Sequence, residues 1–226
     1  MILLILFLII GITLFSLFGS WYAKKYNKPD ALIVLYVVFV LMSNLLAFKI
    51  ASYDLGFITL YAPAGVLIFS VTFLLTDIVN EKFGRRETHK MIFIAFITQV
   101  IATLFIFLAL KLSPAPFWNN QLIFQQVFGF VPRVILASWI AFLVSENTDA
   151  YIFAYLKNLT KGKHLWLRNV ISSIPSMAID TIIFIVIAFY NIQPLNSLII
   201  SVIIIKFLVA IIDIPFMYLN RYIMFK

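Results

Sequence analysis

The chain of 226 residues is 64% hydrophobic and only 12% charged, with a formal net charge of +8. Charged residues make up about a quarter of a soluble domain, so this composition excludes a water-soluble globular protein and indicates an integral membrane protein. Because cysteine is absent, the sequence offers no disulfide, no thiol nucleophile and no cysteine-bound metal.

Seven apolar segments are long enough to cross a bilayer, which takes about 20 residues in a helix. In chain order they are 1–22, 31–52, 58–80, 90–112, 132–156, 169–190 and 196–220. Turn-forming residues such as Gly84 and Pro194 separate them. A further stretch, 117–133, is too short to span, and we expect an interfacial or re-entrant segment with Trp118 at headgroup level. The sequence predicts an all-α, polytopic transmembrane helix bundle in a single domain, 1–226.

The distribution of Lys and Arg predicts the orientation of these helices. Of the 17 basic residues, 13 fall in the first, third and fifth connections or at the C-terminus. Since positively charged connections stay in the cytosol, we expect the N-terminus outside and the C-terminus in the cytosol. The positive net charge then reflects topology, and we expect no nucleic-acid partner. The first segment lacks a basic start, so we expect a retained helix rather than a cleaved signal peptide.

Five ionisable residues lie well inside the predicted spans. They are Glu146, Asp149, Asp180, Lys206 and Asp213. Each ionised side chain near the bilayer centre costs about 2.5–3.5 kcal/mol, so these groups must face one another or a water-filled cavity. Purely structural pairing, with Lys206 against Asp180 or Asp213, is one alternative. One lysine cannot neutralise four carboxylates, however, and the surplus of acid favours a functional site.

The sequence offers no catalytic constellation. Its two histidines, His89 and His164, lie in connections expected to be cytosolic, and no metal-ligand spacing, Gly-x-Ser-x-Gly motif or Walker motif is present. A transporter needs none of these, but it does need a polar site between helices near the bilayer midplane. We therefore expect a transporter rather than an enzyme, with neither cofactor nor metal.

Several motifs, taken in order, resemble one transporter family. They are SNLLAFKI (43–50), TFLLTDIVNEKFGRR (72–86), RVILASWIAFLVSENTDAYIF (133–153), LWLRNVISS with the IDT that follows (165–181), and IIIKFLVA (203–210) with Pro215. Together they resemble the queuosine precursor transporter family, six-to-seven-span proteins that import 7-cyano-7-deazaguanine and related bases. The resemblance implies a six-span core at 31–224 after an extra N-terminal helix and loop at 1–30. The chain departs from the family pattern at Glu146 and Met177, where glutamine is usual, and at Asp213.

The resemblance implies that the chain imports such a 7-deazaguanine base across the cytoplasmic membrane as a multi-pass secondary carrier. Its partners would be the small base and the lipid bilayer, while proton coupling and a homo-oligomer are left open. The adjacent N–H and amino groups of the base suit one carboxylate in a bidentate pair, and Lys206, Arg133 or an asparagine suits its carbonyl. The expected substrate-binding residues are Asn44, Asp77, Arg133, Glu146, Asp149, Asp180 and Lys206.

A second set of charges closes the third span. Glu81 lies one turn after Asp77 and four residues before Arg85, a spacing that favours an ion pair on a continuous helix. We expect Glu81, Arg85 and Arg86 to form a conformational latch and topology anchor, while Asp77 faces the transport cavity. The alternative is an ordinary charged helix end and tight cytosolic turn, held together by an ion pair between Glu81 and Arg85.

A different functional class is also compatible with the sequence. The chain could be the substrate-binding subunit of a vitamin or nucleobase transporter that depends on a separate energy-coupling ATPase. Small residues on one face of the first helix would favour such an assembly, and Gly11, Ser16 and Gly19 offer that face only loosely. Transport by the chain alone would distinguish the two classes.

Overall fold

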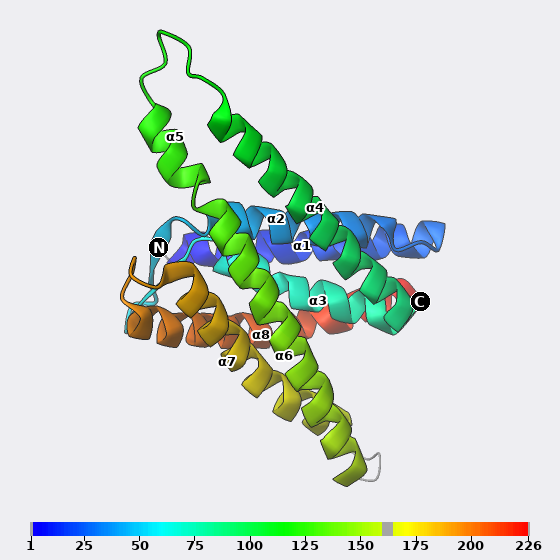
Figure 1. Ribbon diagram of the computed structural model, residues 1–226. Helices are drawn as coiled ribbons and strands as arrows, with labels where there is room; N and C mark the ends of the chain where they lie inside the picture. The colour runs from blue at the N-terminus through cyan, green and yellow to red at the C-terminus, as the bar shows by residue number, and fades with distance from the viewer. Residues whose placement is uncertain (1, 160–164, 226) are drawn as a thin grey trace. The chain divides into compact units, whose positions relative to one another are not determined.

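A computed structural model shows a helical protein with one short β-hairpin (Figure 1). The structure describes residues 2–159 and 165–225, and in these ranges it describes all side chains except those of 2–6, 8–9, 146–147, 149–150, 153–154, 156–158 and 165–173. The elements of the described residues are α1 (Ile2–Tyr26), α2 (Asp30–Leu46), β1 (Ile50–Asp54), β2 (Thr59–Pro63), α3 (Val66–Phe83), α4 (Arg85–Lys111), α5 (Gln121–Phe128), α6 (Val131–Leu159), α7 (Leu165–Phe189) and α8 (Leu195–Phe225).

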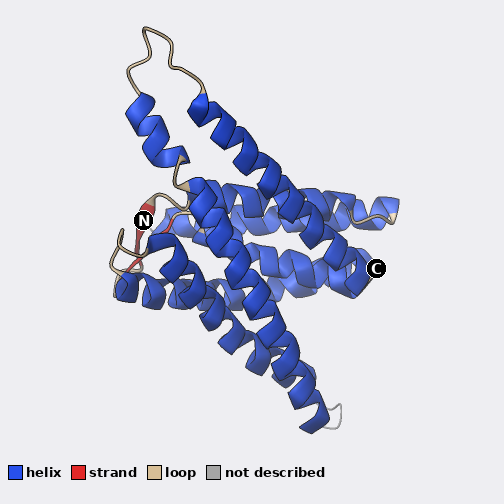
Figure 2. Cartoon of the chain, in the orientation of Figure 1, coloured by secondary structure: helices blue, strands red, loops and turns tan. Residues whose placement is uncertain are grey.

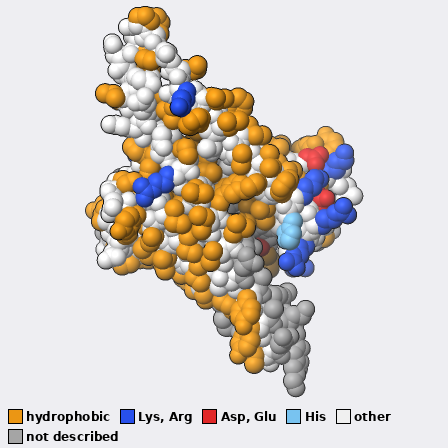
Figure 3. All heavy atoms as spheres, viewed as in Figure 1, with side chains coloured by type: hydrophobic (Ala, Val, Ile, Leu, Met, Phe, Trp, Pro, Cys, Tyr) orange, Lys and Arg blue, Asp and Glu red, His pale blue; other side chains and the backbone are white. Residues whose placement is uncertain are grey.

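The predicted all-α membrane fold is confirmed. Within the described residues, three stretches are long and apolar enough to cross a membrane: Arg85–Lys111, Gln121–Ser145 and Leu195–Phe225. The second of these joins α5, the turn after it and the first half of α6. Two shorter apolar helical stretches, Asp30–Leu46 and Ile174–Phe189, accompany them. Hydrophobic side chains accordingly dominate the face seen in Figure 3.

The β-hairpin corrects the predicted spans 31–52 and 58–80. α2 ends and α3 begins well inside those limits, because β1 and β2 pair antiparallel between them, with Ala51 opposite Ala62 (Figure 2). Exposed and buried side chains alternate at the start of β2, which is the period of a strand rather than a helix. The turn uses Gly56 at φ 88° and the Asp54 carboxylate, whose Oδ1 accepts a hydrogen bond from the Gly56 N–H at 2.9 Å.

The hairpin is closed by a side-chain hydrogen bond between its own strands, and the helices that it joins pass close to each other. The Tyr53 hydroxyl donates to the Pro63 carbonyl at 3.3 Å, and burial raises the pKa of Tyr53 to about 12. Gly65, directly before α3, passes so close to α2 that a Cβ there would lie 2.7 Å from the Cα of Ser43. Only glycine fits at this crossing.

The chain forms two compact units, Met1–Pro132 with Ile204–Lys226, and Arg133–Ile203. In the first unit, α1, α2 and α3 pack side by side, and α4 crosses α2 and α3 (Figure 1). The core-facing positions of α3 include Val71, Leu75 and Val79, all fully buried. In the second unit, α6 and α7 run antiparallel, since the start of α6 is hydrogen-bonded to the end of α7.

Candidate functional site

A buried pair of amides lies in the first unit. Asn44 on α2 and Gln99 on α4 are 3% and 4% exposed, and the Asn44 Nδ2 donates to the Gln99 Oε1. Each amide has a further donor and acceptor, and their hydrogen bond joins α2 to α4. The sequence prediction included Asn44 but missed Gln99, although a lone glutamine inside an apolar span was a visible signal.

Lys206 is buried on the part of α8 that belongs to the first unit, with 3% of its surface exposed. Its Nζ lies 5.3 Å from the centroid of the Phe69 ring on α3, a cation–π contact that partly offsets the cost of removing the ammonium from water. Further along, Arg221 of α8 pairs with Glu81 of α3. These ordered contacts show that α3 and α8 run in the same direction, as expected for the predicted third and seventh spans.

In the second unit, α7 buries a polar face. Ser176, Asp180 and Thr181 are 7%, 4% and 0% exposed, and Ser176 and Asp180 are one turn apart on the same side of the helix. The Thr181 hydroxyl is occupied by the helix itself, since it donates to the Met177 carbonyl at 2.8 Å. Asp180 therefore provides the ionisable group of this face.

Arg133, at the start of α6, is hydrogen-bonded to the end of α7. Its Nε donates to the Ile187 carbonyl at 2.8 Å and its Nη2 to the Tyr190 carbonyl at 3.0 Å. These carbonyls lie at the end of α7, where a helix leaves carbonyl groups without intrahelical partners and where positive charge is favourable. The observed contacts make Arg133 a cap that fixes α6 to α7.

The structure describes the side chain of Asp77 but not those of Glu146 and Asp149. Asp77 lies on α3 in the first unit and is exposed. Glu146 and Asp149 belong to α6, but their side chains lie outside the described residues. The first unit thus holds Asn44, Asp77 and Lys206, and the second holds the other members of the predicted site.

The ion pair between Glu81 and Arg85, which the alternative interpretation of this stretch required, is not formed. Gly84 takes φ 82° and ends α3, so the two residues are not on one continuous helix and lose the spacing on which the prediction depended. Glu81 Oε1 instead accepts from Arg221 Nε at 3.0 Å, and Arg85 Nε lies 3.4 Å from His89 Nε2. The charged contact at this turn therefore joins α3 to α8, and sequence spacing could not predict this partner. Arg86 is exposed.

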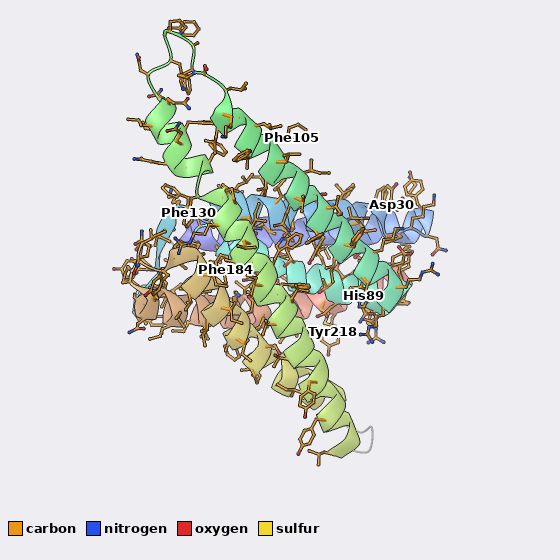
Figure 4. The ribbon with its side chains drawn as sticks, in the orientation of Figure 1. Asp30, His89, Phe105, Phe130, Phe184 and Tyr218 are labelled. Atoms are coloured by element: carbon orange, nitrogen blue, oxygen red, sulfur yellow. The ribbon has the colours of Figure 1, made fainter. Side chains whose placement is uncertain are left out.

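Charged residues gather at one end of the first unit, where α3 ends and α4 begins (Figure 3). Asp30 and His89, labelled in Figure 4, both lie at this end. Lys82 Nζ donates to the Met224 carbonyl of α8 at 3.2 Å, and burial, followed by the charge of Lys24, lowers the pKa of Lys82. The ends of α1, α3 and α8 thus share one side, as their assignment to the cytosol requires.

The small residues of α1 pack inside the first unit. Asn220 of α8 donates from Nδ2 to the Ser16 hydroxyl at 2.9 Å and accepts at Oδ1 from the Ser20 hydroxyl at 2.6 Å. A Cβ added to Gly19 would lie 2.5 Å from Leu32 of α2. Two of the three residues considered for contact with an ATPase partner, Ser16 and Gly19, are therefore used within the chain.

Comparison with known proteins gives the family context. Residues 63–220 match the model of a family described as "Putative vitamin uptake transporter". A "Probable queuosine precursor transporter" of Bacillus subtilis is 34% identical over 163 residues, 70% of this chain and 71% of that protein. A protein of the same name from Haemophilus influenzae is 29% identical over 127 residues, 56% of this chain and 52% of that protein. No solved structure matches the chain.

Proposed function

Because this chain belongs to the vitamin uptake transporter family, we propose that it carries a queuosine precursor across the cytoplasmic membrane into the cell. The protein is a multi-pass membrane transporter and not an enzyme. The observation that carries the proposed substrate class is the 34% identity to a relative named for queuosine precursor transport. Buried polar side chains in apolar helices support it, because such groups mark substrate pathways in membrane proteins.

The proposed substrate is a 7-deazaguanine base such as 7-cyano-7-deazaguanine. Asp180, buried on α7, would accept the ring N–H and the exocyclic amino group in a bidentate pair. In the first unit, the proposed donors to a base carbonyl are Lys206 and the amide pair formed by Asn44 and Gln99. Asp77, Glu146 and Asp149 remain further proposed substrate-binding residues.

Arg133 takes a supporting part in this proposal. Its two hydrogen bonds to α7 carbonyls would hold α7 at a fixed height against α6, and so set the depth of Asp180. Glu81 and Arg221 would replace the expected Glu81–Arg85 pair as the charged latch, with Arg85 and Arg86 anchoring the turn on the cytosolic side.

We propose a secondary carrier rather than the subunit of an ATP-driven complex. The support for this choice is that Ser16, Ser20 and Gly19 of α1 pack against α8 and α2, which removes the face that an ATPase partner was expected to use. The purified chain, reconstituted alone in liposomes without ATP, should take up labelled 7-cyano-7-deazaguanine. Uptake that appears only when an ATPase complex is added would favour the other class.

The proposed site is tested with a carboxylate-to-amide change. Removing one partner of a buried charged hydrogen-bond pair costs about 2–5 kcal/mol, so Asp180→Asn should weaken base binding by about 30-fold or more. Glu87→Gln is the matched control, because Glu87 forms a partly exposed i,i+3 pair with Lys90 at 3.2 Å, which contributes little. Unchanged binding by a folded Asp180→Asn protein would remove Asp180 from the site.

A further inference from the structure

The part of α8 that belongs to the first unit, from Ile204 onward, carries three buried polar residues at a spacing of seven. Lys206, Asp213 and Asn220 are 3%, 7% and 0% exposed, although α8 is apolar enough to cross a membrane. Seven residues are close to two helical turns, so the three side chains lie on one face. That face is turned into the protein.

The two outer members of this stripe have partners, whereas in the middle one the carboxylate oxygen Oδ1 has none among the described residues. Lys206 lies over the Phe69 ring, and Asn220 is hydrogen-bonded to Ser16 and Ser20. Asp213 Oδ1 is buried without any hydrogen-bond partner among the described residues, and the hydroxyl of Thr103 is the other such atom. A carboxylate in this state is far more costly than a hydroxyl.

The charged groups on the neighbouring helices are engaged elsewhere or lie at a distance. On α3, Glu81 pairs with Arg221, Lys82 donates to a carbonyl at the end of α8, and Asp77 is exposed. On α1, Ser20 is the residue that contacts Asn220 of α8. The basic residue of α1 nearest to Ser20 in sequence is Lys24, whose charge acts on Lys82 of α3. Lys206 itself begins about 10 Å along the helix axis from Asp213.

An ionised carboxylate without a partner in this position would be strongly disfavoured, while a neutral carboxylic acid is tolerated. We propose that Asp213 is a proton-binding site of the transporter, protonated in the conformation described here. Pro215, inside α8, cannot donate to the carbonyl four residues before it and weakens the helix next to Asp213. A rearrangement at that turn would expose the acid to water and release the proton on the opposite side from uptake.

This inference depends on the proposed carrier function, and the test separates the two. In proteoliposomes, wild-type protein should accumulate labelled 7-cyano-7-deazaguanine when the uptake side is acidic. Asp213→Asn should lose that accumulation at least tenfold yet retain exchange of labelled for unlabelled base at equal pH, because exchange needs no net proton movement. Asp213→Glu keeps the carboxyl and should restore accumulation, and Glu87→Gln should behave as wild type.

Infrared spectroscopy of the purified protein provides a measurement that does not depend on the base. Wild-type protein at neutral pH should show a protonated-carboxyl band that Asp213→Asn lacks. The proposal is overturned if this band is absent, if accumulation survives in Asp213→Asn or follows sodium instead, or if exchange is lost together with accumulation. A wild-type protein that shows the band but neither binds nor exchanges the base would refute the carrier function and support the protonated Asp213.

Discussion

The contact between α1 and α8 predicts a measurable loss of stability when Asn220 is truncated. Asn220→Ala removes two buried interhelical hydrogen bonds, those with Ser16 and Ser20. Interhelical hydrogen bonds in membrane proteins average about 0.6 kcal/mol and reach about 1.7, so two of them predict about 1–3 kcal/mol. The vacated volume adds to this cost, because the side chain is fully buried.

The assay is unfolding of the purified protein in mixed micelles, as a double-mutant cycle with Ser20→Ala. The two single changes should be non-additive by about 0.5 kcal/mol or more, since both remove the same hydrogen bond. Asn119→Ala is the matched control, because Asn119 is exposed in the loop before α5 and should change stability by less than about 0.5 kcal/mol. Additive effects in the cycle, or a loss at Asn220 no larger than that of the control, would refute the packing of α1 on α8.

Two further predictions concern the crossing of α2 with α3 and the orientation of the protein. Gly65→Ala should destabilise the protein by about 1–3 kcal/mol, because the added Cβ meets the backbone of Ser43. Gly11→Ala is the control, because no atom lies within 4 Å of its added Cβ, and it should gain up to about 1 kcal/mol from helix propensity. Equal stability of the two variants would contradict the close crossing. In this cysteine-free chain, a cysteine at Asn119 should react with an impermeant reagent in intact cells and one at Lys25 only after permeabilisation, and the reverse pattern would invert the topology.

The helices could be predicted from sequence because their signals are long and local. A run of about 20 apolar residues bounded by turn residues predicts a span whatever it packs against. The hairpin could not be found in that way, since most of residues 50–63 were assigned to the ends of the two predicted spans 31–52 and 58–80. Only the two-residue alternation around Tyr53 and the turn at Gly56 distinguish it, and a window of span length averages both away.

The sequence predicted which polar residues of the apolar helices are unusual, but not which residues they contact. Depth in the membrane identifies Asp180 and Lys206 as unusual from sequence alone, and both are buried. Partners that are set by tertiary packing were missed, namely Gln99, which pairs with Asn44, and Arg221, which pairs with Glu81. The Glu81–Arg85 prediction failed for a related reason: it assumed that the helix continued, while Gly84 at positive φ stops the helix and redirects Glu81 to a residue 140 positions away in sequence.

A polar residue in an apolar helix indicates that a partner is needed, but it does not indicate where in the sequence that partner lies. Asn44 finds its partner 55 residues away and Ser20 finds Asn220 at a separation of 200, and both contacts fix the packing of helices. A polar group with such a partner is accounted for by structure. Among the described residues, Asp213 has a buried carboxylate oxygen, Oδ1, that has no hydrogen-bond partner. No hydrogen bond from the described residues therefore offsets the free-energy cost of burying that oxygen in this conformation. It is therefore at Asp213, more than at the polar residues already paired, that a second conformation of the transporter should differ from the one described.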